Sequence, residues 1–140
     1  MATKVSELMN KQPIKLPSSS PIIDAARKMA EAGIGAVLVE DGDKLCGVVT
    51  DRDITIRAVA KGRDPAKTKL AEICSSDLAT VSAEDELDHA IEVMRDKAVR
   101  RVVVTDGQRK ALGVLSLGDL ALERDPRSVL GQISAAPANH

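Results

Sequence analysis

The chain contains no phenylalanine, tyrosine or tryptophan among its 140 residues. Its core therefore has to be built from aliphatic side chains, methionine and alanine. A pocket for a nucleobase would have aliphatic walls, because no aromatic ring is present to stack on the base. The same absence counts against binding of single-stranded nucleic acid, which commonly relies on aromatic stacking platforms.

A strong net charge and long apolar runs are also missing. Lys and Arg number 20 against 21 Asp and Glu, so the net charge at pH 7 is −1. Nucleic acid is not expected as a partner, because there is no basic stripe to attract it. No apolar run approaches membrane-spanning length, and residues 1–4 contain no apolar signal core. We therefore expect no membrane association and a cytoplasmic location.

Cysteine and histidine are scarce, with two of each. Cys46 and Cys74 lie in apolar contexts without CxxC spacing, which predicts buried free thiols rather than a disulfide or a zinc site. The sequence shows no nucleophile–base pair, no metal cluster and no phosphate-cradling glycine loop. It therefore predicts no catalytic residues, no metal and no required cofactor, and hence a protein that is not an enzyme.

The chain does contain a motif that occurs twice. Residues 47–53 read GVVTDRD and residues 113–119 read GVLSLGD. In both, a glycine opens an apolar pair, a hydroxyl residue follows, and an aspartate stands three positions after the hydroxyl. We interpret each copy as a strand running into a helix, with hydroxyl and carboxylate together at the junction. That arrangement favours a sugar-phosphate ligand over bond-breaking chemistry.

The pattern around the motif is duplicated as well. Apolar stripes at helical spacing predict two equivalent helices, and short apolar runs predict three strands in each copy. Two β-α-β-β-α units should thus fill the chain, as residues 1–66 and 67–133, with a frayed tail at 134–140. The predicted stripes are Ile22, Ala25, Ala26 and Met29, and Leu87, Ala90, Ile91 and Met94; the predicted strands are 14–16, 36–39, 45–49, 79–81, 102–104 and 111–115.

Helix boundaries can be predicted from residue type. Ser20 is expected to cap the first stripe helix, with Pro21 at its first position. Asp85 is expected to cap the second stripe helix, and Asp51 the helix that runs from the motif to about Lys61. Gly33 should end the first stripe helix, because it tolerates left-handed backbone.

The doubled G-h-h-[ST]-x-x-D motif resembles a tandem pair of cystathionine-β-synthase (CBS) domains, or Bateman module, and in particular small stand-alone bacterial CBS-pair proteins. The resemblance covers roughly residues 1–133. It implies an α+β fold, in which two repeats pack through their sheets with pseudo-two-fold symmetry. It also implies a homodimer that binds AMP, ADP or ATP, or S-adenosylmethionine, in clefts between repeats. The implied role is regulatory, with a signal passed to an effector protein.

The resemblance implies roles for the motif residues. Asp53 and Asp119 match the ribose-binding aspartate of the family, and a carboxylate suits a pair of ribose hydroxyls. Thr50 and Ser116 match the hydroxyl that helps to hold phosphate or ribose. The alternatives are a helix-starting acid favoured by the helix dipole and a plain N-cap.

Basic and small residues occupy equivalent places before the central strands. The family implies that Arg100 or Arg101 reaches a phosphate; because side chains alternate along a strand, at most one should point into the cleft. A surface salt bridge is the alternative. Gly35 and Ala36, their equivalents in the first repeat, would leave room for adenine, or simply allow close packing. The family further suggests backbone bonds to the adenine edge from Leu16, Thr80 and Val81.

The two sites should not be equivalent. The first motif contains Asp51 and Arg52, where the second contains Leu117 and Gly118. We expect unequal affinities, and Asp51 is a candidate for repelling anions. The competing hypothesis for the whole chain is a dimerising structural scaffold with vestigial pockets.

Overall fold

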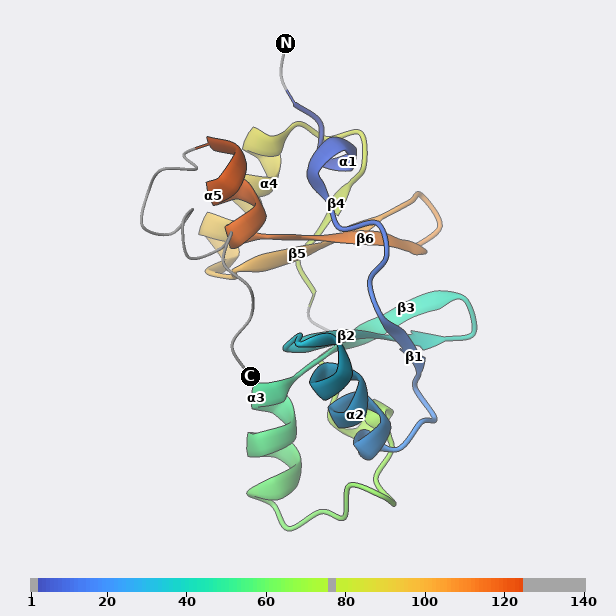
Figure 1. Cartoon of the computed structure of the whole chain (residues 1–140). Coiled ribbons are helices and arrows are strands. Elements are labelled where there is room, and N and C mark those ends of the chain that lie inside the picture. Colours follow the sequence, from blue (N-terminus) through green and yellow to red (C-terminus); the bar gives the residue numbers. More distant parts are fainter. Residues whose placement is uncertain (1–2, 76–77, 125–140) are drawn as a thin grey trace. The chain divides into compact units, whose positions relative to one another are not determined.

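The structure is a computed structural model that describes residues 3–75 and 78–124 (Figure 1). It contains two three-stranded sheets, β1-β2-β3 and β4-β5-β6, each with its own helices. One compact unit is Pro13–Leu78, and the other combines the residues before Pro13 with those from Ala79 onward. The predicted α+β class and the two repeats of similar topology are confirmed. The predicted tail, 134–140, lies outside the described residues.

The two sheets have the same mixed topology. The first strand of each pairs in parallel with the second, which pairs antiparallel with the third. The first unit contains β1 (Lys15–Pro17), α2 (Ile22–Ala32), β2 (Ala36–Asp41), β3 (Lys44–Thr50), α3 (Asp51–Asp53), η1 (Ile54–Val59) and η2 (Leu70–Glu72). The second contains α1 (Val5–Leu8), β4 (Thr80–Ser82), α4 (Leu87–Lys97), β5 (Arg101–Thr105), β6 (Ala111–Ser116) and α5 (Leu117–Arg124).

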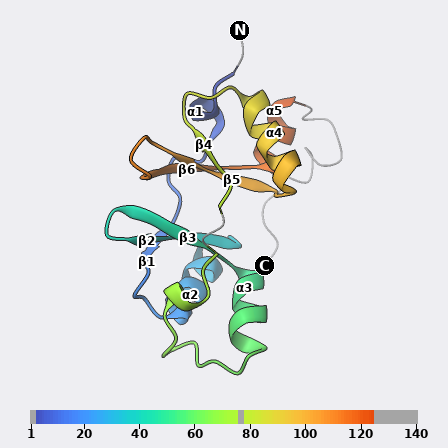
Figure 2. The ribbon, with the colours of Figure 1, turned by 180° about the vertical axis from the view of Figure 1, so that it is seen from behind.

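Within each unit the helices lie on one face of the sheet. Figures 1 and 2 show α1, α4 and α5 on the same side of the sheet β4-β5-β6, and α2 on one side of β1-β2-β3. Each predicted stripe supplies three buried side chains to the core of its unit. These are Ile22, Ala25 and Met29 in α2, and Leu87, Ala90 and Met94 in α4. The prediction of two equivalent amphipathic helices is therefore confirmed.

The segment before β1 packs in the unit of the second repeat. Val5 is fully buried in the core that contains β4, α4 and β6, and its N–H donates to the carbonyl of Asp85 at 2.8 Å. Asn10 and Val114 exchange two backbone hydrogen bonds, of 2.8 and 3.1 Å. Residues 3–12 thus extend the second unit, although they precede the first repeat.

The equivalent segment between the repeats packs in the unit of the first. The N–H of Leu70 donates to the carbonyl of Ser20 at 2.9 Å, and Leu70 is fully buried beneath α2 and β2. Val48 and Ser75 exchange backbone bonds of 3.1 and 3.0 Å. A compact unit therefore differs from a sequence repeat, because each repeat's opening segment packs in the other unit. The repeat bounds 1–66 and 67–133 stay a prediction about the sequence.

The opening glycine of each motif is needed for this packing. A Cβ atom on Gly47 would lie 2.5 Å from the carbonyl oxygen of Ser75, and one on Gly113 would lie 2.5 Å from that of Asn10. Real Cβ atoms do not approach backbone oxygens so closely. Because they have no side chain, both glycines allow close packing of the backbone of the segment that precedes the first strand of a repeat.

The N-caps predicted at Ser20, Asp85 and Asp51 were wrong, because in each case a neighbouring residue occupies the N-cap position. Pro21 takes the N-cap position of α2, because its extended backbone (ψ 153°) pairs with Lys69, and Ser20 lies one residue further out. Glu86, not Asp85, is the N-cap of α4, since the Asp85 carboxylate instead accepts the N–H of Ser82 at 2.9 Å.

The third misplaced cap lies at the first motif. Thr50 is the N-cap there, and Asp51 is the first helical residue. After one α-helical turn the chain continues as a π-helix over Ile54–Val59, which ends slightly before the predicted Lys61. Gly33 does end α2 with left-handed backbone (φ 64°), as predicted.

The two cysteines are free thiols, as predicted, but both are half-buried rather than buried. They pack against the edge of the first unit's core, Cys46 from β3 and Cys74 from the segment after η2. Burial and the neighbouring Cys46 thiol raise the pKa of the Cys74 thiol above its ordinary value of 9.0.

Candidate functional site

Strand pairing brings most of the predicted site residues together at one corner of each unit. In the first unit Ala36 pairs with Thr50, and the carbonyl of Gly35 accepts the N–H of Asp51 at 3.0 Å. We call this strand-to-helix junction the first corner. It forms where β2 begins and β3 ends, so residues distant in sequence meet there.

The second unit builds the same corner from the equivalent positions. Arg101 pairs with Ser116, and the carbonyl of Arg100 accepts the N–H of Leu117 at 2.7 Å. This is the second corner. The two corners therefore share the same backbone pairing at the junction and differ in the side chains that they present.

At the first corner, the hydroxyl and carboxylate of the motif bond to each other. The Asp53 carboxylate accepts from the Thr50 N–H at 2.9 Å and from the Thr50 hydroxyl at 3.0 Å. The Asp53 N–H in turn donates to the Thr50 hydroxyl oxygen at 3.1 Å. This reciprocal pattern is a capping box, which satisfies N–H groups at the start of a helix.

Ser116 and Asp119 repeat the arrangement at the second corner. The Asp119 carboxylate accepts from the Ser116 N–H at 2.9 Å, and the Asp119 N–H donates to the Ser116 hydroxyl at 3.1 Å. The N-cap alternative for the two hydroxyl residues is therefore present in the structure. The ligand-binding role of these four residues stays a prediction.

A pocket opens beside each corner. The first has a volume of about 330 Å³ and is lined by Asp51, Arg52, Thr55 and Ile56. The second has a volume of about 490 Å³ and is lined by Arg100, Arg101, Ser116, Leu117 and Gly118. Both volumes fall in the range of about 300–1,000 Å³ that is usual for small-molecule sites.

Both arginines of the second corner line its pocket. Strand alternation does not separate them, because β5 begins at Arg101 and Arg100 precedes it. Both side chains are exposed, and neither guanidinium forms an ion pair with another residue in 3–75 or 78–124. The salt-bridge alternative thus finds no partner among these residues, and two positive charges face the pocket.

At the first corner a carboxylate lies beside the small residues. The Asp51 Oδ2 atom would be 3.2 Å from a Cβ atom placed on Gly35, and its Oδ1 atom accepts the Arg52 N–H at 2.8 Å. Gly35 thereby leaves room for the Asp51 carboxylate. That Gly35 and Ala36 also leave room for adenine stays a prediction.

The three residues suggested for the adenine edge lie further along their sheets. Leu16 pairs with Val39, three positions beyond Ala36 in β2. In the other sheet, Thr80 and Val81 pair with the third and fourth residues of β5. Val81 is buried in the core, whereas Thr80 is exposed. Within each unit these residues are thus separate from the corner.

Of the other basic residues, Arg57 has structural contacts. Its guanidinium donates to the carbonyl of Ile73 at 3.2 Å and lies 3.7 Å from an Asp53 oxygen. It therefore ties η1 to the segment after η2.

Four pocket-lining residues were not predicted as site residues from the sequence: Thr55, Ile56, Leu117 and Gly118. Ile56 and Leu117 are large apolar side chains that are 42% and 40% exposed. That exposure is a property of the folded chain, so the residue types alone did not identify these two pocket walls.

Within residues 3–75 and 78–124, no three His, Cys, Asp or Glu side chains gather in a way that would hold a metal ion. No helix there is long and apolar enough to cross a membrane.

The sequence and the fold of this chain are similar to those of known proteins. The family model of the CBS domain matches residues 5–59 and 70–124. Protein MK0525 of Methanopyrus kandleri is 30% identical over 120 residues, which are 85% of this chain but only 61% of that protein.

Two solved structures extend the comparison to the fold. A protein with CBS domains from Burkholderia ambifaria has a TM-score of 0.79 and 30% identity, covering 90% of this chain and 96% of that one. The CBS domain pair of protein MJ0100, in complex with 5′-methylthioadenosine and S-adenosyl-L-methionine, has a TM-score of 0.80 and 25% identity. That match covers 91% of this chain and 100% of the other.

Proposed function

Because the chain belongs to the CBS domain family, with two copies of the domain, we propose that it is a regulatory, non-enzymatic module that binds an adenosyl ligand. AMP, ADP, ATP and S-adenosylmethionine are the candidates. The observation that carries the proposal is the doubled corner, where a bonded pair of hydroxyl and carboxylate lies next to a pocket of small-molecule size. Ser116 lines its pocket, whereas Thr50, Asp53 and Asp119 are chain neighbours of lining residues. A structurally similar CBS domain pair holds two adenosyl ligands, which supports it.

The capping bonds leave the carboxylates able to bind a ligand. A carboxylate has two oxygens with about four acceptor sites. The capping bonds of Asp53 and of Asp119 all go to one oxygen of each, Oδ2. The remaining acceptor sites suit the two hydroxyls of a ribose, although the Oδ1 atom of Asp53 also lies 3.7 Å from Arg57. The capping box holds the carboxylate in place before the ligand arrives.

Binding would act through a shift in conformational populations. A ligand favours the arrangement for which it has the higher affinity, by the difference in its binding free energies. We propose that the signal is passed to a partner protein. We propose the cytoplasm as the compartment.

The proposal can be tested with the purified chain. Since the protein lacks aromatic residues, bound purine would dominate its near-ultraviolet absorption. A ligand at a hundredfold excess over its Kd should stabilise the fold by about 2.7 kcal/mol, which raises the melting temperature. If no purine copurifies, and AMP, ADP, ATP and S-adenosylmethionine all leave the melting temperature unchanged, the proposal is wrong.

One observation favours a second candidate, a structural scaffold with vestigial pockets. The hydroxyl and carboxylate groups at both corners are already bonded within the chain. In a scaffold these capping boxes would be the whole reason for the motif. The same melting experiment separates the two candidates, because a scaffold gains no stability from nucleotides.

We further propose a homodimer. Both units expose large apolar side chains before the central strand and on the helix that begins at the motif. These are Ile34, Ile56 and Val59 in the first unit, and Val99, Leu117 and Leu122 in the second. Ile34 and Val99 are equivalent positions of the repeats, as are Ile56 and Leu122. Substituting Val59, which is 61% exposed, by Lys should shift the mass measured by light scattering toward the monomer. A wild-type chain that is monomeric at high concentration would contradict the proposal.

A further inference from the structure

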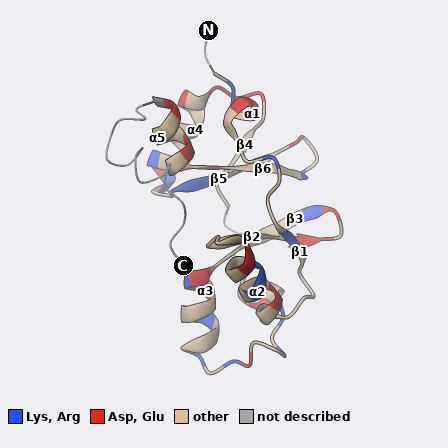
Figure 3. Cartoon of the chain, viewed as in Figure 1, with Lys and Arg blue, Asp and Glu red and all other residues tan. Residues whose placement is uncertain are grey.

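The two corners carry different charges at equivalent positions. Where the second corner has Arg100 and Arg101, the first has Gly35 and Ala36. Where the first corner has Asp51, the second has Leu117. Figure 3 shows basic residues at the start of β5 and acidic residues at the start of α3. The strand pairing and the capping bonds are the same at both corners, so these charges lie at equivalent positions.

We propose that the corners sort adenosyl ligands by charge. The second corner holds the phosphate group of a nucleotide, and the first takes an adenosyl ligand without phosphate. The inference rests on the proposed function, because it concerns the same corners. It adds which chemical class of ligand each corner accepts, and it predicts that two different ligands can be bound at once.

The second corner has the groups that a phosphate requires. Two guanidinium groups line one pocket, without an ion pair to any other residue in 3–75 or 78–124. Arg side chains bind phosphate oxygens in bidentate fashion, through charge-assisted hydrogen bonds. Ser116 adds a hydroxyl, Gly118 leaves space because it has no side chain, and Leu117 offers an apolar wall. The pocket is lined by no acidic residue that would oppose a phosphate.

The first corner is unsuited to a phosphate. Its lining includes one negative side chain, Asp51, and one positive side chain, Arg52, so the formal charges cancel. The Asp51 carboxylate lies beside Gly35, whose equivalent in the other unit is Arg100, and it accepts the Arg52 N–H at 2.8 Å. A phosphate placed there would meet a fixed like charge at short range. An uncharged thioether or a positively charged sulfonium on the ribose meets no such repulsion.

The test is calorimetric titration of the full chain with two probes, ATP and 5′-methylthioadenosine. The decisive variant is Arg100→Ala/Arg101→Ala, whose two side chains are exposed. We expect its affinity for ATP to fall at least about tenfold, because charge-assisted hydrogen bonds are lost. Its affinity for methylthioadenosine should stay within about twofold, since that ligand carries no phosphate.

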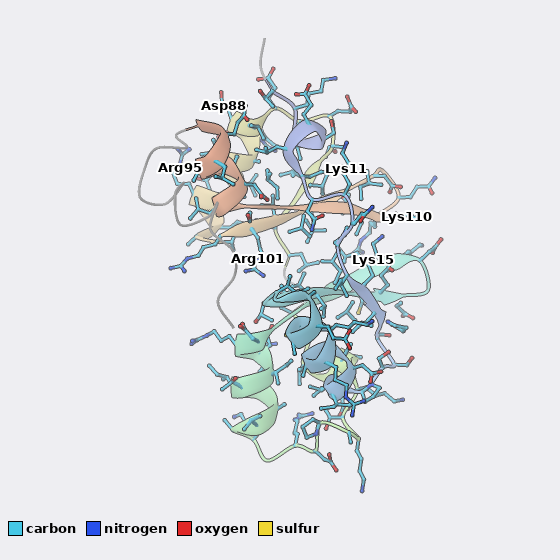
Figure 4. All side chains as sticks on the ribbon, in the orientation of Figure 1. Lys11, Lys15, Asp88, Arg95, Arg101 and Lys110 are labelled. Atoms are coloured by element: carbon cyan, nitrogen blue, oxygen red, sulfur yellow. The ribbon has the colours of Figure 1, made fainter. Side chains whose placement is uncertain are left out.

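A matched control removes two positive charges elsewhere in the same unit. Lys110 lies at the end of the β5–β6 hairpin opposite to Arg101, and Lys11 follows Asn10, which pairs with Val114 of β6; both lysines are labelled in Figure 4. The variant Lys11→Ala/Lys110→Ala should bind ATP within about twofold of wild type at physiological salt. A loss as large as that of the arginine variant would show a general charge effect and overturn the inference.

The complementary variant is Asp51→Leu, which removes the negative charge from the first corner and places there the residue of the second. We expect the affinity of the first corner for ATP to rise, because the like charge is gone, with methylthioadenosine binding preserved. The inference is overturned if the arginine variant binds ATP like wild type, or if it loses both probes equally. Those outcomes leave the proposed function intact, as long as the wild-type chain binds either probe. If the wild-type chain binds neither, the proposed function itself is wrong.

Discussion

The Oδ2 atom of Asp53 lies 2.9 Å from the backbone nitrogen of Thr50 and 3.0 Å from its hydroxyl oxygen. The carboxylate proposed to bind ribose thus also starts a helix. A substitution of Asp53 that removes both carboxylate oxygens therefore changes both the stability of the fold and the binding of the ligand. Two variants of the same residue can separate them.

The first prediction concerns Asp53. The variant Asp53→Asn keeps an oxygen that can accept the Thr50 N–H, so its stability should stay within about 0.5 kcal/mol of wild type. Asp53→Ala removes the acceptor from the capping box and should destabilise the fold by about 1 kcal/mol, the typical contribution of a hydrogen bond. Loss of the charge-assisted bonds in Asp53→Ala should weaken nucleotide binding by about 1.5–3 kcal/mol. Urea unfolding and calorimetry measure the two effects.

Binding that is unchanged in Asp53→Ala would mean that the carboxylate is not the ribose anchor. The motif would then be explained by helix capping alone. Asp119→Ala provides the matched test at the second corner, where the same two capping bonds are present.

A second prediction concerns the glycines that open the motif. Gly47→Ala and Gly113→Ala each force a methyl group against a backbone oxygen, at 2.5 Å before any relaxation. Overpacking of this kind typically costs about 1–3 kcal/mol. Gly107→Ala is the control, because a Cβ atom there meets nothing within 4 Å. Equal stability of all three variants in urea would show that the opening segments do not pack closely on these glycines.

The duplicated motif allowed much of the fold to be predicted. The apolar stripes of α2 and α4 are buried as expected. Val37, Leu38 and Val39 are buried in succession, as predicted for a strand covered on both faces. These patterns are local, since burial of one face or both determines the residue types within a single element. Such elements can be predicted without knowledge of their neighbours.

The errors came from contacts between distant segments. Ser20 has the residue type of an N-cap, but its carbonyl is used by Leu70, 50 residues later. Asp85 has an equally good residue type, but its carbonyl is used by Val5. In both cases an opening segment from the other repeat fixes the chain in extended form before the helix. No local pattern in the sequence indicates that exchange.

The candidate site was predictable in part for the same reason. The offset between the repeats identified Arg100 and Arg101 as equivalents of Gly35 and Ala36, and strand pairing places each pair at a corner. The apolar pocket walls were missed, because Leu117 has no feature in sequence that separates it from a core residue. Only its 40% exposure in the folded chain does so.

A third prediction concerns the turn between β5 and β6. The Asp106 carboxylate accepts backbone N–H groups from Gln108 at 2.8 Å and from Lys110 at 3.0 Å, which lowers its pKa below the ordinary 3.8. The stabilisation is present above the unfolded-state pKa and is lost as the pH falls through the lower folded-state pKa. Asp106→Asn should therefore lose less stability than wild type on acidification. Equal losses in acid titrations followed by circular dichroism would contradict this assignment.

A fourth prediction concerns Cys74. Burial, and then the adjacent Cys46 thiol, raise its pKa above 9.0, so the thiol stays protonated at neutral pH. Because the thiolate is the reactive form, iodoacetamide should modify Cys74 more slowly in the folded chain than in urea. The folded state binds this proton more tightly, so the associated stability is present below pH 9 and is lost as the pH rises through the folded-state pKa. In Cys46→Ala, removal of the neighbouring thiol should lower the pKa and speed the reaction, as measured by mass spectrometry. If Cys74 instead reacts as fast in the native chain as in urea, burial in the folded chain does not protect its thiol.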